Sequence, residues 1–348
     1  MTDKTPTTLY IIGNGFDLHH RLDTWYSSFG LFLRDHHSNI YEYFIKYFGF
    51  PDLDEDDEES LKDPLWSQFE ANLATFNIDE VLDEHSEFVA NPASDDFRDG
   101  DWDTIAVYVS QIRDDLTIKM LALFKEFILN VAYPEKDQLN LLNIDKNAVF
   151  FNFNYSKSLE HYYQIPPVQI LYIHNRAESN DKLILGHGMD PKEFARKPAN
   201  PPEGLSDEEF EEWRQGQADG FNLSLERGRD ELIEYFTKSF KATAQLIQKN
   251  EPFFDSLKSI KKIYILGHSL ADVDKEYFEK ILKSVNNQAV WIVSYYNGKE
   301  KKVRRNRLKK IGIKGRKILL IQMNALIPNF WNRVKLSSRI TLAKIRYI

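Results

Sequence analysis

The sequence of 348 residues contains no cysteine, which excludes disulfide bonds, thiolate metal ligands and a cysteine nucleophile. No apolar run is long enough to cross a membrane, so we expect no membrane span. No signal peptide precedes the first apolar segment, and we therefore expect a cytoplasmic protein. Hydrophobic residues make up 42% of the chain and aromatic residues 14%, which is enough to build a packed core.

Charge is unevenly distributed along this acidic chain, whose net charge is −8. An acidic run occupies residues 52–60, a basic run occupies 299–317, and 325–348 carry lysine and arginine but no acidic residue. Such runs are most often solvated surfaces. The alternative is a basic surface for nucleic acid, a membrane or an acidic partner. The basic run lacks the interleaved aromatic residues of a single-strand binding groove, so the nucleic-acid interpretation is weakly supported.

Short apolar runs bounded by polar residues predict the strands of an α/β domain. We predict strands at 8–13, 148–153, 168–174, 262–267, 289–294 and 317–322, with a further extended piece at 183–186. Apolar residues at helical spacing predict helices at 156–164, 206–215, 225–249, 274–284 and 300–312. The alternation predicts a Rossmann-like, largely parallel, doubly wound sheet.

More than a hundred residues of mostly helical pattern separate the first two strands, too many for a simple βαβ crossover. They include a long predicted helix at 102–131. We therefore predict a Rossmann-like nucleotide-binding core, a helical insertion or lid, and a basic C-terminal tail. The predicted bounds are 1–18 and 148–323 for the core, 19–147 for the insertion and 324–348 for the tail.

The run GNGFD follows the first predicted strand and begins a predicted helix. Gly13 and Gly15 would let the backbone turn and approach a ligand, and the helix N-terminus favours an anion such as a pyrophosphate. Leu18 stands where the GxGxxG fingerprint has its third glycine, so an ordinary glycine turn is an equal alternative. Asp17 would either cap helix amides or bind a ribose hydroxyl.

Polar residues also follow the other predicted strands. In NFNYS, Asn152 and Asn154 would either bond to loop backbone beside a Ser156 cap or orient a sugar hydroxyl and a water. At later strand ends, His174, His187 and His268 are each either a structural residue, a general base, or a metal ligand with Asp272 or Asp274. Their spacing fits no known zinc motif, so we expect no metal.

The run GHSLADVD follows the strand predicted at 262–267. Ser269, Asp272 and Asp274 would either cap the next helix or contact a nucleotide at the same sheet edge. The run is not GxSxG, which argues against Ser269 as a hydrolase nucleophile.

Five ordered runs resemble the AbiH-like bacteriophage abortive-infection family: IGNGFDLHHRLDTWYSSF, LWSQFE, NFNYSKSLE, LGHG and ILGHSLADVDKEYF. The resemblance extends from residue 9 to about residue 285. The family usually has glycine where Arg21 stands here. The order of the motifs also resembles that of sirtuin-like NAD-binding domains of prokaryotic immunity.

The sirtuin-like resemblance implies roles for individual residues. Asn154 matches the catalytic asparagine, and either His174 or His187 matches the catalytic histidine. The cofactor-binding residues that it implies are Gly13, Asn14, Gly15, Asp17, Tyr155, Gly267, His268, Ser269 and Asp272. Trp66 and Glu70 of LWSQFE would close over the site.

Together the resemblances imply an anti-phage effector that binds NAD as its substrate and hydrolyses it to nicotinamide and ADP-ribose. The partners to expect are NAD or a related nucleotide, a phage-derived trigger and a second copy of the chain. The alternative is a nucleotide-binding sensor or toxin without NADase activity, which would act on nucleic acid through the basic face at 299–317.

Overall fold

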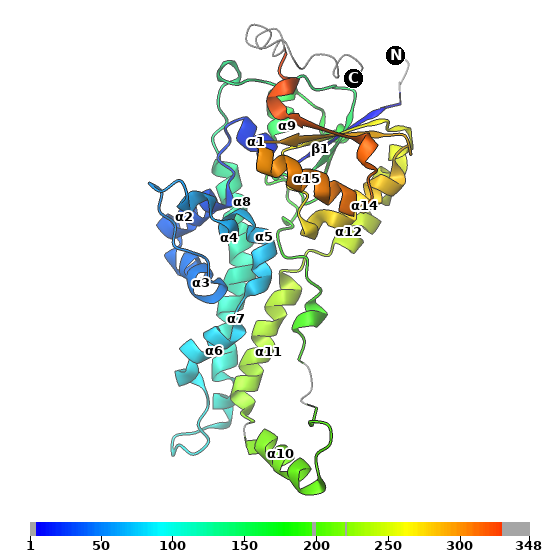
Figure 1. Ribbon diagram of the computed structural model, residues 1–348. Helices are drawn as coiled ribbons and strands as arrows, with labels where there is room; N and C mark the ends of the chain where they lie inside the picture. Colours follow the sequence, from blue (N-terminus) through cyan, green and yellow to red (C-terminus); the bar gives the residue numbers. More distant parts are fainter. Residues whose placement is uncertain (1–4, 197–199, 220, 329–348) are drawn as a thin grey trace. The chain divides into compact units, whose positions relative to one another are not determined.

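The computed structural model describes residues 5–196, 200–219 and 221–328, which divide into two compact units. Residues within 1–25, 125–184 and 242–348 form the first, here the sheet unit, and residues within 26–124 and 185–241 form the second, here the helical unit. The sequence prediction divided the chain elsewhere, since it placed residues 185–241 with the core. Figure 1 colours the chain from its N-terminus to its C-terminus.

The sheet unit is built on six parallel strands in the order β3-β2-β1-β4-β5-β6. The strands are β1 Thr8–Ile12, β2 Val149–Asn152, β3 Ile170–Tyr172, β4 Lys262–Leu266, β5 Val290–Tyr295 and β6 Ile318–Gln322. This confirms the predicted parallel α/β sheet. The order is that of a Rossmann fold, in which the winding direction reverses between β1 and β4.

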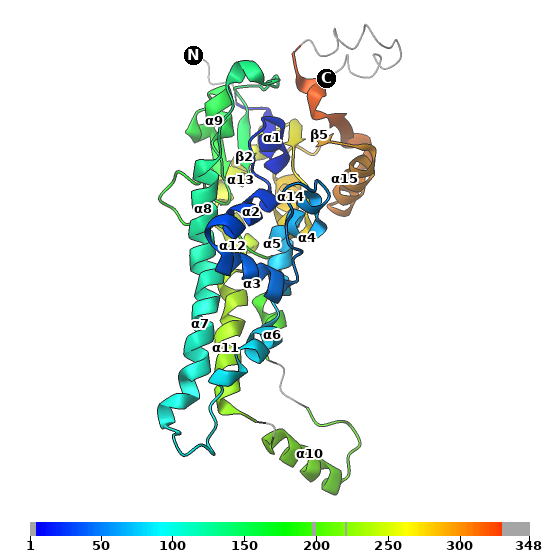
Figure 2. The same ribbon diagram turned by 90° about the vertical axis from the view of Figure 1, so that its left-hand side faces the viewer.

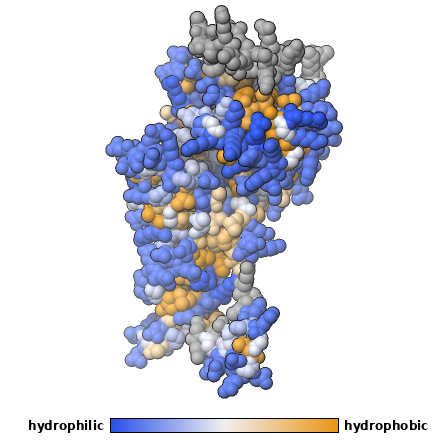
Figure 3. Space-filling model, in the orientation of Figure 1, coloured by the Kyte–Doolittle hydropathy of each residue, from blue (hydrophilic) through white to orange (hydrophobic). Residues whose placement is uncertain are grey.

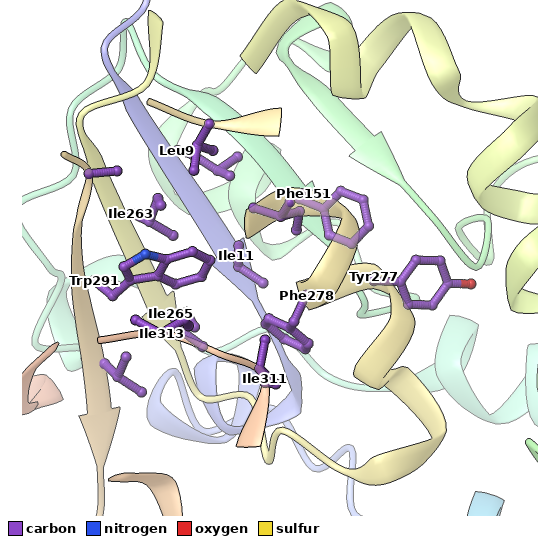
Figure 4. Packing of buried hydrophobic residues seen from close by; sticks show 14 of the residues in the cluster. Leu9, Ile11, Phe151, Ile263, Ile265, Tyr277, Phe278, Trp291, Ile311 and Ile313 are labelled. Atoms are coloured by element: carbon purple, nitrogen blue, oxygen red, sulfur yellow. The ribbon is translucent and has the colours of Figure 1, made fainter. Parts of the chain in front are cut away.

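Two hydrophobic cores cover the two faces of the sheet. Because side chains alternate along a strand, Leu9 and Ile11 of β1 enter one core while Tyr10 and Ile12 enter the other. Figure 4 shows Ile11 packed with Trp291 and Phe278 in the first of these cores. Burial on both faces explains why the strands read as continuous apolar runs rather than alternating ones.

Helices of the sheet unit connect the strands and pack on both faces. They are α1 Asn14–His19, α9 Ser158–Tyr163, α12 Thr243–Lys249, α13 Glu251–Ser256, α14 Lys275–Ser284 and α15 Gly298–Lys310. Phe16 and Leu159 place α1 and α9 on one face, whereas Phe254 and Phe278 place α13 and α14 on the other. The six predicted strands and the helices at 156–164, 274–284 and 300–312 are therefore present, with ends shifted by at most two residues.

The helical unit contains the segment between the first two strands and the later segment 185–241. Its helices are α2 Tyr26–His36, α3 Ser38–Phe48, α4 Pro64–Ser67, α5 Phe69–Asn72, α6 Ile78–Glu84, α7 Thr104–Asp114, α10 Asp207–Asp219 and α11 Leu223–Lys238. Figure 2 shows α7 beside α11, and the two helices make extensive contact. Buried aromatic rings, among them Phe44, Trp66 and Phe69, fill the core.

The long helix predicted at 102–131 forms as α7, a π-helical turn at Asp115–Lys119, and α8 Met120–Asn130. The residues of α8 from Lys125 onward belong to the sheet unit.

Two predicted elements were wrong. The single helix expected at 225–249 is broken into α11 and α12, because Ser239 and Lys241 exchange backbone hydrogen bonds with His187. The extended piece expected at 183–186 forms no strand; its neighbour His187 makes an isolated parallel bridge with Phe240 instead. Of the predicted basic tail, residues 329–348 lie outside the described part of the chain. No helix among the described residues has both the length and the apolar character needed to span a membrane.

Candidate functional site

The strand register places four strand ends side by side. Ile12 pairs with Asn152 and with Leu266, and Asn152 pairs with Tyr172, so these residues form one row across β3, β2, β1 and β4. The segments that follow each strand therefore emerge at the same edge of the sheet. In open α/β sheets this carboxyl edge, where the strand order reverses, is where ligands bind.

The glycine turn after β1 packs directly on the loop after β4. The amide of Gly13 donates to the carbonyl of Leu266 at 3.0 Å, and the amide of Gly15 donates to the carbonyl of Gly267 at 2.9 Å. A Cβ on Gly13 would lie 2.6 Å from Cα of His268, and one on Gly15 would lie 2.9 Å from Cα of Gly267. The structure thus gives the glycine pair a packing role that the sequence did not reveal.

Gly267 is constrained most strongly at this contact. Its φ of +71° lies in the left-handed region, and an added Cβ would meet the backbone nitrogen of Phe16 at 2.1 Å. Only glycine satisfies both conditions. The Gly13 and Gly15 amides are already used within the fold, so these two groups are not the donors for the pyrophosphate that the sequence led us to expect at this turn.

Asn14, between the two glycines, holds the chain that follows α1. Its carboxamide accepts a hydrogen bond from the Thr24 hydroxyl at 2.6 Å and donates to the Thr24 carbonyl at 2.8 Å. Asn14 and Gly15 are nevertheless partly exposed, as is Gly267. These three residues form the solvent-facing surface of the turn.

Asp17 is buried and joins the β1 turn to the segment after β2. It accepts hydrogen bonds from the Ser156 hydroxyl at 2.5 Å and the Ser158 hydroxyl at 2.6 Å. Burial raises the pKa of this carboxyl to about 6, against the lowering effect of the hydrogen bonds from Ser156, Ser158 and Asn154. No side chain caps the start of α1, so Asp17 is not the expected helix cap. Its 1% exposure also leaves no room for a ribose hydroxyl in this conformation.

Asn154 lies at the centre of the cluster. Its Nδ2 donates to the Gly13 carbonyl at 3.2 Å, and its amide donates to Oδ1 of the buried Asn152 at 3.0 Å. The Asn154 carboxamide therefore donates through Nδ2, and Oδ1 is the atom of this group that can accept a hydrogen bond. NFNYS and the GNG turn are thus in direct contact.

His174 follows β3 and is 2% exposed. Its ring lies against Phe153, with centroids 5.5 Å apart, and against Tyr155, with centroids 6.2 Å apart. The Tyr155 hydroxyl donates to the carbonyl of Ile184 at 2.8 Å. Phe153 also contacts His268 at 4.2 Å between ring centroids, so this phenyl ring contacts both His174 and His268.

His268 has both ring nitrogens engaged. Nδ1 accepts from the amide of Leu270 at 2.8 Å, which places the proton of a neutral imidazole on Nε2, 3.4 Å from Oδ2 of Asp274. These contacts hold the β4 loop in shape, and Leu270 itself adopts a φ of +57°. His268 is therefore a structural residue of the turn and not a free base.

The remaining residues of the GHSLADVD run are more open. Ser269 and Asp272 are exposed, and the Ser269 carbonyl accepts from the guanidinium of Arg307 in α15 at 2.8 Å. Neither side chain caps α14. Among the described residues, no group of three or more histidine, aspartate or glutamate side chains could hold a metal ion.

His187 belongs to the helical unit, whereas the strand-end cluster belongs to the sheet unit. It is fully buried, its Nε2 donates to the Phe236 carbonyl at 3.0 Å, and burial lowers its pKa. The preceding Gly186 is required there, because a Cβ would lie 1.9 Å from the Ser239 carbonyl oxygen. The LGHG run therefore has a local packing role in this unit.

The LWSQFE run also lies inside the helical unit. Trp66 is fully buried, and its indole N–H donates to the Pro51 carbonyl at 2.9 Å. Glu70 forms an ion pair with Lys241 and accepts from the Tyr26 hydroxyl at 2.6 Å. The ring of Trp66 packs within the aromatic core of the helical unit, and closure of this segment over a ligand stays a prediction.

Three partners at the sheet edge were missed by the sequence interpretation. Ser156 and Ser158 bind Asp17, and the hydroxyl of Ser294 accepts from the Gly267 amide at 2.8 Å. Ser294 lies near the end of β5, in the run VWIVSY. Ser294 is a polar residue near the end of an apolar strand. The same feature identified the polar residues that follow β1, β2, β3 and β4.

The strand order and the strand-end cluster define a Rossmann-like α/β protein whose candidate site lies at the reversal between β1 and β4. The model of the bacteriophage abortive infection AbiH family matches residues 9–295. The chain therefore belongs to this family, which suggests a role in defence against phage. No curated protein and no solved structure matches the chain.

Proposed function

We propose that this AbiH-family protein binds NAD at the strand-order reversal of its sheet and hydrolyses it to nicotinamide and ADP-ribose, so that cofactor loss halts an infected cell. The observation that carries the proposal is the convergence of Gly13, Asn154 and Gly267 at one edge of a sheet with Rossmann order. Dinucleotides bind at this position in such sheets. The resemblance of the ordered motifs to sirtuin-like NAD-binding domains supports the same ligand.

In this proposal the glycine turns provide a flat backbone surface rather than an amide cradle. Gly15 and Gly267 have no side chains and are partly exposed where they meet, so a nucleotide can approach the backbone closely. The half-exposed Asn14 and the exposed Ser269 border this surface along the chain. Asp17 acts indirectly, by fixing the segment that carries Asn154.

The hydrolytic step needs an oriented ribose and a base for the water proton. Oδ1 of Asn154 would accept a hydrogen bond from a ribose hydroxyl, since Nδ2 is held by the Gly13 carbonyl. Water attacks C1′ of the nicotinamide ribose, the C1′–N bond breaks, and nicotinamide leaves with the bonding electron pair. His174 accepts the water proton as general base. We prefer His174 to His187 because it lies in the same unit as Asn154.

The test is to incubate the purified chain with NAD and to measure nicotinamide and ADP-ribose by chromatography. Asn154→Ala and His174→Ala should each lower the rate by about 100-fold or more, as expected for loss of an orienting group or a general base. Asn180→Ala, an exposed asparagine of the same unit, is the matched control and should not change the rate.

Binding is measured separately from turnover, by the rise in melting temperature that NAD causes. If NAD raises the melting temperature of the purified chain, but neither the purified chain nor phage-infected cells show NAD turnover, the protein is a nucleotide-binding sensor instead of an enzyme. Absence of both stabilisation and turnover contradicts the proposal as a whole. Melting of each variant without NAD shows whether a loss reflects unfolding.

A further inference from the structure

Helix α10 is strongly acidic and carries an aromatic pair. Five of its first six residues are acidic, Asp207, Glu208, Glu209, Glu211 and Glu212. Phe210 and Trp213 lie one turn apart with stacked rings, 6.0 Å between centroids, and Phe210 is 39% exposed. Figure 3 shows an apolar spot within the otherwise hydrophilic surface of this helix.

The side-chain hydrogen bonds of α10 link its residues to one another or to Ser206, which directly precedes the helix. Glu209 accepts from the amide and hydroxyl of Ser206, and Arg214 donates to Glu211 at 2.6 Å. Among the described residues, no helix or strand packs extensively against α10. A helix of 13 residues is marginal in water without tertiary packing, so the exposed Phe210 and the partly exposed Trp213 beside it indicate a partner.

Helix α15 has the complementary character. It also has 13 residues, of which eight are lysine or arginine and one, Glu300, is acidic. Leu308 is buried in the core of the sheet unit, so the opposite side of the helix faces solvent. Val303 is 45% exposed on α15, and Tyr296, just before the helix, is 83% exposed. Exposed cations surround these apolar groups along the sequence.

We propose that α10 of one copy of this chain docks on α15 of a second copy. The aromatic pair of α10 would cover Val303 and Tyr296, while its carboxylates meet the lysine and arginine side chains around them. Opposite charges select this pairing, and like charges disfavour α10 with α10 or α15 with α15. The proposal is independent of the proposed NAD chemistry.

The contact joins two different surfaces, so a pair still presents one unused α15 on the first copy and one unused α10 on the second. Such heterologous contacts continue into a ring or an open filament. Each helix is about 20 Å long, which makes the interface small. The assembly should therefore be weak, concentration-dependent and sensitive to salt.

The experiment measures the mass of the full chain by light scattering after size exclusion, over a range of protein concentrations. We expect dimers or larger species at about 50 mM salt and monomers at about 500 mM, since added salt shortens the range of charge attraction. Glu208→Lys with Glu212→Lys should yield monomers at low salt, as should Lys302→Glu with Arg305→Glu. An equimolar mixture of the two variants should associate again, because the unchanged α10 of the second variant meets the unchanged α15 of the first, and the two reversed helices also carry opposite charge changes.

The matched control is Asp56→Lys with Glu59→Lys, which makes the same charge change as the α10 variant in the exposed acidic loop of the helical unit. It should associate like the wild type. A monomeric wild type at low salt, or a mixture of variants that stays monomeric, overturns the proposal.

A single-stranded oligonucleotide probe distinguishes the nucleic-acid alternative. If the probe binds the wild type and the α10 variant equally, fails to bind the α15 variant, and the wild type stays monomeric, then α15 is a nucleic-acid surface and the proposal is wrong. Circular dichroism of each variant checks that the exposed substitutions leave the fold intact.

Discussion

The sheet unit and the helical unit differ in whether non-glycine residues adopt a positive φ, a backbone conformation that such residues rarely occupy. Among the described residues, the non-glycine residues with positive φ are Arg21, Gln164, Asn175 and Leu270, and all lie in the sheet unit. Asn175 directly follows His174 after β3, and Leu270 directly follows Ser269 after β4. Strained backbone persists only where surrounding structure enforces it, and it gathers at functional sites.

Among the described residues of the helical unit, every positive φ belongs to a glycine, and this unit is held by aromatic packing and by a buried ion pair between Glu70 and Lys241. Its family motif LWSQFE supplies core residues. Motifs of the same family therefore serve different purposes in the two units: in the sheet unit they shape the carboxyl edge of the sheet, whereas in the helical unit they stabilise the fold.

The sharpest test of this difference replaces one left-handed glycine in each unit. Gly267→Ala should cost more than about 4 kcal/mol, because the new methyl group would overlap the Phe16 backbone. Gly49→Ala, at a φ of +69° but with no atom within 4 Å, should cost about 1–2 kcal/mol, the cost of the left-handed conformation alone. Urea unfolding measures both. Equal losses would contradict the packing role assigned to Gly267.

Breaking the buried ion pair tests the stabilising role of the helical unit. Lys241→Met leaves the Glu70 carboxylate without its cation at a site where the lysine side chain has no solvent exposure. The free energy of unfolding should fall by about 3–5 kcal/mol. Adding Glu70→Gln should recover part of the loss, since the unpaired charge is then removed. A loss below about 1 kcal/mol for Lys241→Met would show that the pair is unimportant.

Asp17 should give the sheet unit a pH dependence. Burial raises its pKa from 3.8 to about 6. The folded protein therefore holds this proton more tightly than the unfolded chain, and the contribution of Asp17 to stability is fully present below pH 3.8 and is lost as pH rises through about 6. At about 1.4 kcal/mol per pKa unit, the difference is about 3 kcal/mol.

Unfolding of the wild type and Asp17→Asn between pH 4 and 7 measures this contribution. The difference in unfolding free energy between the two proteins should change by about the same amount across this range. A constant difference would contradict the raised pKa.

The smallest expected effect concerns Arg21, which stands where the family usually has glycine and adopts a φ of +58°. Arg21→Gly relieves the left-handed strain but loosens the unfolded chain, so we expect stabilisation of at most about 1 kcal/mol. Lys314→Gly, an exposed cation with an ordinary φ of −63°, is the control and should be slightly destabilising. A rise in melting temperature for both variants would show that relief of backbone strain at residue 21 does not explain the stabilisation by Arg21→Gly.

Much of the sheet could be predicted from the sequence, because strands buried on both faces are continuous apolar runs and the helices between them keep their own periodicity. The one-helix prediction for 225–249 failed for a non-local reason. Its interruption is set by backbone bonds to His187, some fifty residues earlier in the chain, which no local pattern records.

For the candidate site, the sequence identified the strand ends but not the function of individual groups. Gly13 and Gly15 were recognised as close-approach glycines, but the close approach that the structure shows is to His268 and Gly267 of the loop after β4. Asp17 was expected at a helix cap or a ribose, and it binds Ser156 and Ser158 instead. Such pairings join segments far apart in sequence.

The sequence by itself determined the strands, the carboxyl-edge location of the polar runs and the AbiH family. Tertiary structure decided which of those runs meet. It brought GNGFD, NFNYS and GHSLADVD together in the sheet unit, and it assigned LWSQFE and the His187 run to the helical unit. The physical reason is that burial and helical or strand periodicity depend on residues close together in the sequence. Hydrogen-bond partners depend instead on which strands lie side by side.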